Sequence, residues 1–443
     1  MESKPEGWSQ QALIFAADNR IAPALAVQAQ LSSSVNQALT ALVEGLSEDT
    51  YCRAIEPARL FCVGGAVRDV LMQREAKDRD WLVVGSTPEH MLAAGFQAVG
   101  RDFPVFLHPQ SHEEYALART EKKVGRGYHG FEFYCDPDVS LEDDLRRRDL
   151  RMNAMAVDAQ GKLHDPYQGL NDLQSRQFQH VSDAFREDPI RLLRVARFCA
   201  RFPDFSIHPQ TMQFMRDMVR DGETGHWTAE RVWREVDQGM SEVKPSALWR
   251  CLADCHLSPF NSLADDDRIM LEQLDRAAAA GLEWRLRWGL WSALASPAWR
   301  AGVLSVLKMP KDMRSLVDRV AQHQTLWLEV LSSQAMPSPA LVAAFFQSLD
   351  VLRRPERLDE VLALLRWHPD LQASPGYEHA VQAMKQLCQV FRSAKCTAPL
   401  QGAALGEAIK EAREQALSTL LVNRYARGLY TELQPPSSAI CPP

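Results

Sequence analysis

The chain has 443 residues, of which 46% are hydrophobic and 24% charged, with a net charge of -7; this is the profile of a soluble globular protein of two to four domains. Its first residues form no secretory signal, and no stretch reaches the roughly 18–20 apolar residues of a membrane span. The nine cysteines are scattered and odd in number, which argues against a disulfide framework and predicts a cytoplasmic protein.

The predicted elements change character along the chain. Residues 1–57 indicate one or two peripheral helices, around 14–27 and 35–46. The next part, up to about residue 180, contains short apolar runs separated by Gly, Pro and Asp, which predict a small mixed sheet with helical pieces. These predicted strands are 60–63, 81–85, 105–108, 115–119 and 131–134. From residue 187 onward the spacing of Leu, Ala and Trp predicts an almost wholly helical structure.

A glycine pair follows the first predicted strand. Gly64 and Gly65 precede a predicted helix whose first turn contains Arg68. Because glycine has no β-carbon, backbone N–H groups there can approach a phosphate, and a helix N-terminus favours an anion. Arg68 would add a charge-assisted contact. A tight turn is the alternative explanation, so the pair indicates a phosphate site only together with a second motif.

That second motif stands at the second predicted strand. Asp78 and Asp80 are two residues apart, and strand side chains alternate, so both project from one face. Carboxylates grouped in this way suit Mg²⁺, which binds through a few carboxylates and substrate phosphates. Two such ions would activate a 3′-hydroxyl and neutralise the charge on a leaving pyrophosphate. A polar strand edge explains the pair equally well in isolation, whereas a phosphate turn followed by this pair is far more specific.

A third carboxylate is predicted on the strand near residue 115. Glu114 shares a face with two small residues, Ala116 and Ala118, while Tyr115 and Leu117 take the other face. Glu114 is therefore our candidate for a third metal-associated, catalytic carboxylate. A solvent-facing glutamate is the alternative.

A chain with a negative net charge can bind nucleic acid only if its positive charge is concentrated in one region. In this chain arginines are concentrated between residues 146 and 201. The arginines there are Arg146, Arg147, Arg148, Arg151, Arg176, Arg186, Arg191, Arg194, Arg197 and Arg201. A salt-bridged, solvated face is the other explanation. Asp188, Arg191, Arg194 and Phe198 recur every three or four residues, which predicts that they share one face of a helix.

Six segments occur in order over about 175 residues: GGAVRD (64–69), KDRDW (77–81), RRDLRMNA (147–154), DPYQGLNDL (165–173), EDPIRLLRVARF (187–198) and TAERVWREV (228–236). In sequence and spacing they resemble the class II tRNA nucleotidyltransferases and bacterial poly(A) polymerases of the polymerase-β-like superfamily, and most of all the bacterial CCA-adding enzymes. The resemblance implies an α+β fold, in which a polymerase-β-like nucleotidyltransferase head with a small mixed sheet precedes an all-helical neck, body and tail.

The implied domains are an N-terminal helical extension (1–57), the catalytic head (58–180), a helical neck with the nucleobase-recognition helix (181–256), and a helical body and tail that bind tRNA (257–443). The implied reaction is template-independent addition of C, C and A to the 3′ end of tRNA from CTP and ATP, with release of pyrophosphate. The tRNA would be gripped at its acceptor and T arms by shape and phosphate contacts. No membrane partner is expected.

The resemblance also implies roles for individual residues. Asp78 and Asp80 would bind magnesium, and Gly64, Gly65 and Arg68 would meet the incoming nucleotide. Arg148 would contact the triphosphate and Asp149 the ribose hydroxyls, which would favour ribonucleotides.

The predicted helix from residue 187 would carry the base recognition. Asp188 and Arg191 would satisfy the base edge of C or A in place of a nucleic-acid template, and Arg194 and Arg197 would serve phosphate or hold those two residues. The polar segment 120–130 would be the flexible loop of the family.

Three features depart from the family pattern. Arg151 stands where a threonine is usual, residues 1–57 have no recognised counterpart, and the segment 286–293 lacks the His-Asp pair of relatives with phosphohydrolase activity. We therefore expect no phosphatase or cyclic phosphodiesterase activity. Zinc at Cys251, Cys255 and His256 is disfavoured against a buried helix face, and the tryptophans at 284–291 indicate core packing rather than base stacking.

Three alternatives to full CCA addition stay open. A poly(A) polymerase would share the motifs of the head, although Asp102 and the segment 103–109 favour the CCA type. Enzymes that add only CC or only A are a second alternative. A catalytically inactive RNA-binding protein is the third, and the intact acidic and arginine motifs argue against it.

Overall fold

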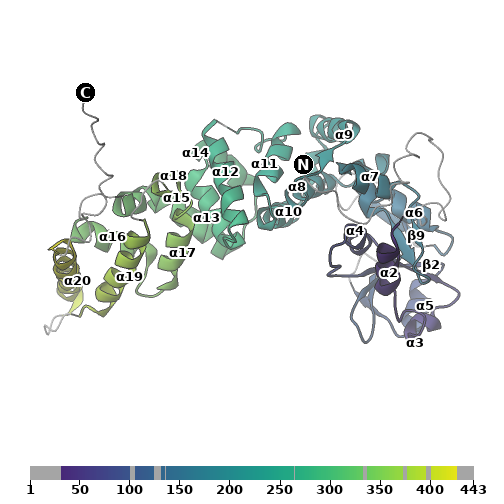
Figure 1. Ribbon diagram of the computed structural model, residues 1–443, viewed down its shortest axis with the longest axis horizontal. Coiled ribbons are helices and arrows are strands. Elements are labelled where there is room, and N and C mark those ends of the chain that lie inside the picture. The colour runs from purple at the N-terminus through teal and green to yellow at the C-terminus, as the bar shows by residue number, and fades with distance from the viewer. Residues whose placement is uncertain are drawn as a thin grey trace, which may run out of the picture. The chain divides into compact units, whose positions relative to one another are not determined.

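The computed structural model describes residues 31–99, 105–123, 131–134, 136–263, 265–332, 337–372, 377–395 and 401–426. The chain divides into two compact units (Figure 1). The first comprises residues 1–195 and 204–228, and the second comprises 196–203 and 229–443. The predicted helix at 14–27 lies outside the described residues.

A mixed sheet forms the centre of the first unit. Among the described residues it has seven strands, in the order β3-β4-β5-β2-β1-β8-β9. They are β1 (Arg59–Val63), β2 (Asp80–Val84), β3 (Gln97–Val99), β4 (Val105–Leu107), β5 (Glu114–Leu117), β8 (Ala156–Asp158) and β9 (Leu163–His164). Strand β2 runs parallel to β5, and the other neighbouring strands are antiparallel. The predicted small mixed sheet is thereby confirmed.

One predicted loop is partly a strand. The first four residues of the segment 120–130 form β6 (Thr120–Lys123), which pairs antiparallel with β7 (Phe131–Tyr134). A two-stranded ribbon can be polar on both faces, so the polar residues gave no sign of it. Residues 124–130 lie outside the described part of the chain.

The two faces of the sheet are packed differently. Alternate apolar side chains of β1 and β2 cover one face and pack with helix α6 (Leu141–Arg146). The residues of this core include Phe61, Val63, Leu82, Val84, Leu141 and Leu145. Helix α6 therefore delivers the arginines that follow it, Arg147 and Arg148, to the same face of the sheet.

The opposite face is covered partly by residues from the N-terminal segment. Helix α2 (Ser33–Leu42) packs against helix α4 (Gly65–Leu71), and helix α3 (Thr50–Ala54) brings Cys52 to within 3.5 Å of the Tyr115 hydroxyl. Residues 31–57 therefore contribute to the core of the first unit. The amphipathic pattern at 35–46 predicted a helix there but could not show where it packs.

The remaining elements of the first unit are one helix between β2 and β3 and a series of elements that follow α6. They are α5 (Pro88–Ala93), η3 (Arg151–Asn153), α7 (Gly169–Ser175), β10 (Gln177–Phe178), η4 (Asp183–Glu187), β11 (Ser206–Ile207), α9 (Pro209–Arg220) and η5 (Glu223–His226). Helix α8 (Ile190–Arg201) begins in the first unit and ends in the second.

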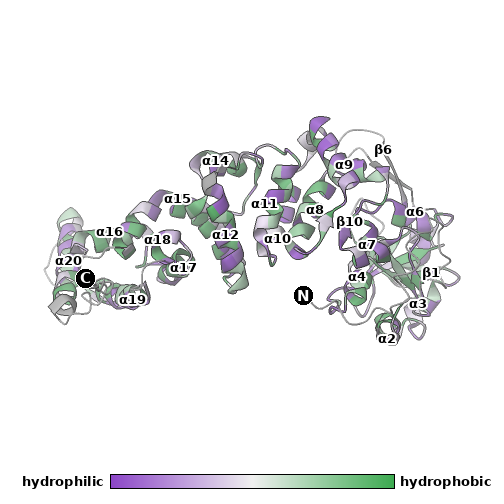
Figure 2. Cartoon of the chain, turned by 45° about the horizontal axis from the view of Figure 1, so that its top comes forward, coloured by the Kyte–Doolittle hydropathy of each residue, from purple (hydrophilic) through white to green (hydrophobic). Residues whose placement is uncertain are grey.

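The second unit is helical throughout its described part. Its helices are α10 (Ala229–Ser241), α11 (Pro245–Asp254), α12 (Asp265–Ala279), α13 (Trp284–Leu294), α14 (Pro297–Val306), α15 (Lys311–Ser332), α16 (Pro339–Leu349), α17 (Glu356–Leu365), α18 (Pro369–Gln372), α19 (Tyr377–Ser393) and α20 (Gly402–Ala426). Most of them carry both hydrophobic and hydrophilic residues (Figure 2), as helices that bury one side do. The described helices include none long and apolar enough to cross a membrane.

A cluster of tryptophans fills part of this second unit. Trp249, Trp288 and Trp291 are fully buried, and the rings of Trp249 and Trp291 stack with centroids 6.1 Å apart. The prediction of core packing is confirmed for Trp288 and Trp291, whereas Trp284 at the start of α13 is partly exposed. Cys251 and Cys255 are buried as expected of an apolar helix face.

Candidate active site

Three predicted carboxylates meet at one end of the sheet. Asp80 is the first residue of β2; its neighbour on β1 is Val63, and its neighbour on β5 is Glu114. Residues paired across strands lie on the same face, so the side chains of Asp80 and Glu114 lie side by side. Asp78 precedes the strand, because β2 begins only at Asp80. All three carboxylates are exposed to solvent.

The carboxylates interact electrostatically. Although Asp80 keeps part of its surface exposed, the surrounding protein removes water from its carboxylate and so raises its pKa. Arg148 opposes this shift, and the nearby charges of Glu114 and Asp78 raise the pKa further. Like charges in such a group repel one another, and a divalent cation would relieve that repulsion. Oxygen ligands that keep one side open are also what Mg²⁺ prefers. The residues present therefore fit a divalent metal ion.

The glycine turn lies directly beside this group. Gly64 follows Val63, the strand neighbour of Asp80, and adopts a left-handed φ of 74° before α4 begins. A β-carbon on Gly64 would lie 3.0 Å from the Arg148 Nη1 atom, and one on Gly65 would lie 3.6 Å from Arg68 Nη2. The turn thus requires glycine at position 64 for its backbone angle and for the close approach of Arg148.

We expect Gly64→Ala to raise the KM for nucleoside triphosphate roughly tenfold, because the new methyl group would displace Arg148 and the backbone at this position would be strained by about 1–3 kcal/mol. Steady-state kinetics with CTP would measure this. Gly222→Ala is the control for a substitution at positive φ away from the site: Gly222 also has a φ of 74°, although its ψ is 15° and that of Gly64 is -125°, and a β-carbon there would have no atom within 4 Å. Equal kinetic effects of the two variants would refute the role of the Arg148 contact.

A buried carboxylate orients the guanidinium of Arg148. Asp144 of α6 is fully buried and accepts from Arg148 Nη2 at 3.3 Å and from Arg147 Nε at 3.1 Å. Despite its burial, these arginines hold the pKa of Asp144 below its usual range. Arg148 stays half-buried, with its guanidinium at the glycine turn. Asp144 was not among the predicted site residues.

Asp149 is the centre of a second buried network. Its carboxylate accepts from the Leu150 backbone at 2.8 Å, from Asn153 Nδ2 at 3.1 Å and from Arg194 Nε at 2.7 Å. Burial opposes ionisation, but Arg194 and these hydrogen bonds hold the pKa of Asp149 well below its usual range. The predicted ribose-binding carboxylate is therefore already hydrogen-bonded within the protein.

The same network reaches the glycine turn. Arg68 is buried and donates to Asn153 Oδ1 at 2.7 Å and to Asp69 Oδ1 at 2.9 Å. Asn153 thus bridges Arg68 and Asp149. Asn153 was not singled out from the sequence, although it stands in the RRDLRMNA segment. A polar amide between the apolar residues Met152 and Ala154 is the signal that could have found it.

The predicted recognition helix begins later than expected. Asp188 does not lie on α8; it stands just before the helix, and its Oδ1 accepts from the Ile190 backbone at 3.3 Å. The reason is Pro189, which favours the first helical position and an extended residue before it. Asp188 and Arg191 are still brought together, because the Arg191 backbone donates to the Asp188 carbonyl at 3.0 Å.

The arginines of α8 have separate surroundings. Arg191 is buried and its Nη1 donates to the Ala184 carbonyl. Arg194 pairs with Asp149, as described above, and Arg197 pairs with Glu235 of α10 at 2.7 Å within the second unit. Arg194 therefore links the start of α8 to the sheet.

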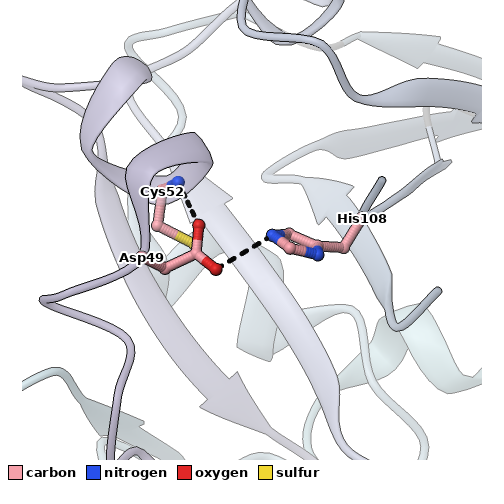
Figure 3. A group of neighbouring side chains, drawn as sticks. All are labelled: Asp49, Cys52 and His108. Atoms are coloured by element: carbon pink, nitrogen blue, oxygen red, sulfur yellow. Dashed lines mark hydrogen bonds and ion pairs between the residues drawn. The ribbon is translucent and has the colours of Figure 1, made fainter. Parts of the chain in front are cut away.

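A separate polar cluster lies on the face of the sheet away from the carboxylates. The ligand atoms of Asp49, Cys52 and His108 all lie within 4.8 Å of one another (Figure 3). His108 Nδ1 accepts from the backbones of Gln110 and Ser111, at 3.3 and 3.1 Å, so the ring proton sits on Nε2, 3.2 Å from Asp49. Burial raises the pKa of Cys52 to about 12, which disfavours the thiolate that a metal ion would need. Hydrogen bonds of Asp49 to the backbone of Cys52 and of the Cys52 thiol to Tyr115, with the ion-pair contact of His108 to Asp49, hold this cluster together.

Clustered carboxylates beside a glycine turn, on a mixed sheet with arginines at its edge, define a nucleotidyltransferase. Residues 60–179 match the family model described as Poly A polymerase head domain. The chain is 40% identical over 402 residues to the "Multifunctional CCA protein" of Aromatoleum aromaticum, covering 81% of this chain and 98% of that one. It is 41% identical over 376 residues to the "CCA-adding enzyme" of Pseudomonas putida, covering 83% and 100%. The chain therefore belongs to the family of bacterial CCA-adding enzymes.

Solved structures share the fold. The Thermotoga maritima CCA-adding enzyme complexed with tRNA superposes with a TM-score of 0.61 at 19% identity, over 88% of this chain and 98% of that one. The Bacillus stearothermophilus CCA-adding enzyme in complex with CTP gives a TM-score of 0.61 at 20% identity, over 90% and 98%. The predicted α+β class with a helical remainder is thus confirmed.

Proposed function

We propose that this protein adds C, C and A to the 3′ end of tRNA, taking CTP and ATP as substrates and releasing pyrophosphate. The observation that carries the proposal is the meeting of Asp80, Glu114 and Arg148 at the glycine turn, in a chain of the CCA-adding family. Scattered cysteines, six of them free among the described residues, fit a cytoplasmic setting.

The reaction forms a bond between the tRNA 3′-oxygen and the α-phosphorus and breaks the bond from that phosphorus to pyrophosphate. Enzymes of this nucleotidyltransferase family use divalent metal ions, here proposed as Mg²⁺ held by Asp78 and Asp80 with Glu114 adjacent. Ions held by these carboxylates would lower the pKa of the attacking hydroxyl and neutralise the charge on the leaving group. Arg148 would bind the triphosphate; its guanidinium at the turn and its interaction with Asp80 support this role.

Selection of C and A is assigned to the region around α8. Asp188 is a hydrogen-bond acceptor and Arg191 a donor, and they stand next to each other at the start of that helix. Arg194, which pairs with Asp149, and Arg197 would serve phosphate or hold Asp188 and Arg191, and Gly64, Gly65 and Arg68 would complete the nucleotide site. The helical body and tail, residues 257–443, would bind the acceptor and T arms of tRNA.

Poly(A) polymerase is the second candidate, because the matching head model bears that description. Asp102, which argued against it, lies outside the described residues. The test is incorporation into tRNA that lacks its 3′ end, with CTP alone, ATP alone, or both. We expect two cytidines from CTP alone and a single CCA from both. A long adenosine tail from ATP alone would instead identify a poly(A) polymerase, and no incorporation in any arm would refute both activities.

A further inference from the structure

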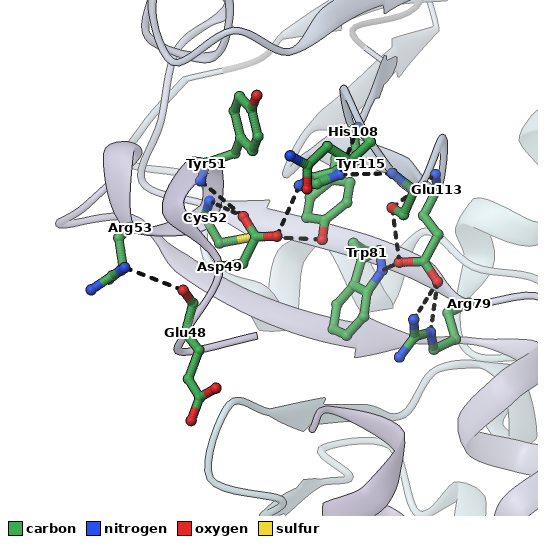
Figure 4. A network of polar contacts seen from close by, with 12 residues as sticks. Glu48, Asp49, Tyr51, Cys52, Arg53, Arg79, Trp81, His108, Glu113 and Tyr115 are labelled. Atoms are coloured by element: carbon green, nitrogen blue, oxygen red, sulfur yellow. Dashed lines mark hydrogen bonds and ion pairs between the residues drawn. The ribbon is translucent and has the colours of Figure 1, made fainter. Parts of the chain in front are cut away.

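An ion pair joins Arg79 and Glu113, the residues next in sequence to the predicted metal ligands (Figure 4). Arg79 lies in sequence between Asp78 and Asp80, and Glu113 immediately precedes Glu114. The Glu113 Oε1 atom is 2.7 Å from Arg79 Nε and 2.6 Å from Arg79 Nη2. In extended chains neighbouring side chains take opposite faces. The ion pair therefore joins the same two segments as the carboxylates do, but on the reverse side of the sheet.

Further contacts fix both members of the pair. Trp81 Nε1 donates to Glu113 Oε2 at 3.0 Å, and the Arg79 guanidinium lies 5.4 Å from the centre of the Trp81 ring. Arg79 Nη1 also donates to the Leu42 carbonyl at the end of α2, at 3.2 Å. Helix α2 thus contacts the residue between the two aspartates.

The Arg79–Glu113 ion pair counteracts the electrostatic repulsion among the three predicted metal ligands. Asp80 and Glu114 are neighbours across β2 and β5, and their negative charges, with that of Asp78, push the two segments apart at this end of the sheet. The Arg79–Glu113 pair attracts the same segments one residue away. The side chains of Arg79 and Glu113 are 36% and 23% exposed, so the attraction is modest. Two Arg79 nitrogens contact Glu113 Oε1 and Trp81 Nε1 donates to Oε2, so both carboxylate oxygens of Glu113 are held in place.

We propose that Arg79 and Glu113 are positioning residues, which hold Asp78, Asp80 and Glu114 together before a metal ion binds. The inference rests on the metal site of the proposed function. Its consequence is specific: weakening the pair lowers the affinity for the divalent ion, while the rate at saturating metal is largely preserved.

The test compares Mn²⁺ binding to the purified full-length protein, with free Mn²⁺ measured by electron paramagnetic resonance. For Glu113→Gln we expect the dissociation constant for Mn²⁺ to rise roughly three- to tenfold, because the variant loses its ion pair with Arg79. Arg79→Lys, which keeps the charge but replaces the two nitrogens that contact Glu113 Oε1 with a single ammonium group, should show a smaller rise. Asp204→Asn is the matched control, because it removes an exposed ion pair with Arg176 at 3.2 Å in the same unit, and it should change the constant less than twofold.

A second measurement separates metal affinity from chemistry. In cytidine incorporation, the half-saturating Mg²⁺ concentration of Glu113→Gln should rise by the same factor, with the maximal rate within about threefold of the unsubstituted enzyme. Unchanged Mn²⁺ affinity in a folded Glu113→Gln protein would overturn the inference, and if that variant does not fold, unchanged affinity in Arg79→Lys would do so. An unsubstituted enzyme that binds Mn²⁺ but adds no nucleotide would refute the proposed function instead.

Discussion

Asp80→Asn is expected to reduce nucleotide addition by about 10³-fold or more without destabilising the protein. The loss follows from the metal site, since charge neutralisation by bound ions contributes several kcal/mol to such a transition state and an amide is a poor ligand. Cytidine incorporation under single-turnover conditions, at saturating Mg²⁺, measures it. Asp204→Asn should keep full activity, because that carboxylate lies in an exposed pair away from the site.

The stability of the same variant provides an independent check. The pKa of Asp80 is raised in the folded protein, so ionisation of this group opposes folding at neutral pH and the penalty disappears as the pH falls below that pKa. Without metal, Asp80→Asn should therefore melt at the same temperature as the unsubstituted protein or slightly higher, and the difference should vanish in acid. Added Mg²⁺ should stabilise only the unsubstituted protein. An active Asp80→Asn enzyme would contradict the assignment.

Short-range patterns in the sequence were sufficient to predict which residues lie at the centre of the candidate site. The strand, the glycine turn and the Asp-x-Asp pair lie within 20 residues of one another, and the alternation of strand side chains grouped Glu114 with Ala116 and Ala118 on one face. The register of β2 and β5 in the structure then sets Glu114 beside Asp80. Their convergence depends only on β1, β2 and β5 being neighbours in one sheet. The roles assigned to these residues remain predictions.

Other parts of the fold have no local signal. Strand β8 has three residues and exists because it pairs with β1, more than 90 positions earlier. The ion pair of Asp149 and Arg194 spans 45 positions, and the hydrogen bond from Arg79 to the Leu42 carbonyl depends on where α2 packs rather than on which side chain it presents. Contacts of these kinds are set by tertiary structure, so short-range patterns do not reveal them.

The start of α8 shows how one residue changes a prediction. A spacing of three and four residues placed Asp188 on the helix with Arg191 and Arg194. Pro189 cannot donate a backbone hydrogen bond and disfavours helical geometry in the residue before it, so Asp188 caps the helix instead. The acidic residue still adjoins Arg191, but its carboxylate is oriented by the cap and not by the helix face.

Arg194→Ala should be the most destabilising single change in the site. It would leave Asp149, which is only 5% exposed, as a buried carboxylate without its cation. Removing one partner of such a pair costs several kcal/mol, and because the Arg194 side chain is partly exposed we expect about 2–4 kcal/mol. Amide hydrogen exchange in β1 and β8, with increasing urea, measures the stability of this unit separately from the second.

The pH dependence of that loss tests its cause. In the unsubstituted protein the pKa of Asp149 lies far below the ordinary value of about 3.9, so the pair contributes its full stability above that value and loses it as the pH falls through the lowered pKa. The difference between Arg194→Ala and the unsubstituted protein should therefore be complete at pH 7 and shrink in acid, where Asp149 becomes protonated in the variant first. The double variant Arg194→Ala with Asp149→Asn should be more stable than Arg194→Ala alone, because no buried charge remains. If the double variant were less stable, or the loss were independent of pH, then packing of the Arg194 side chain and not its charge would account for the effect.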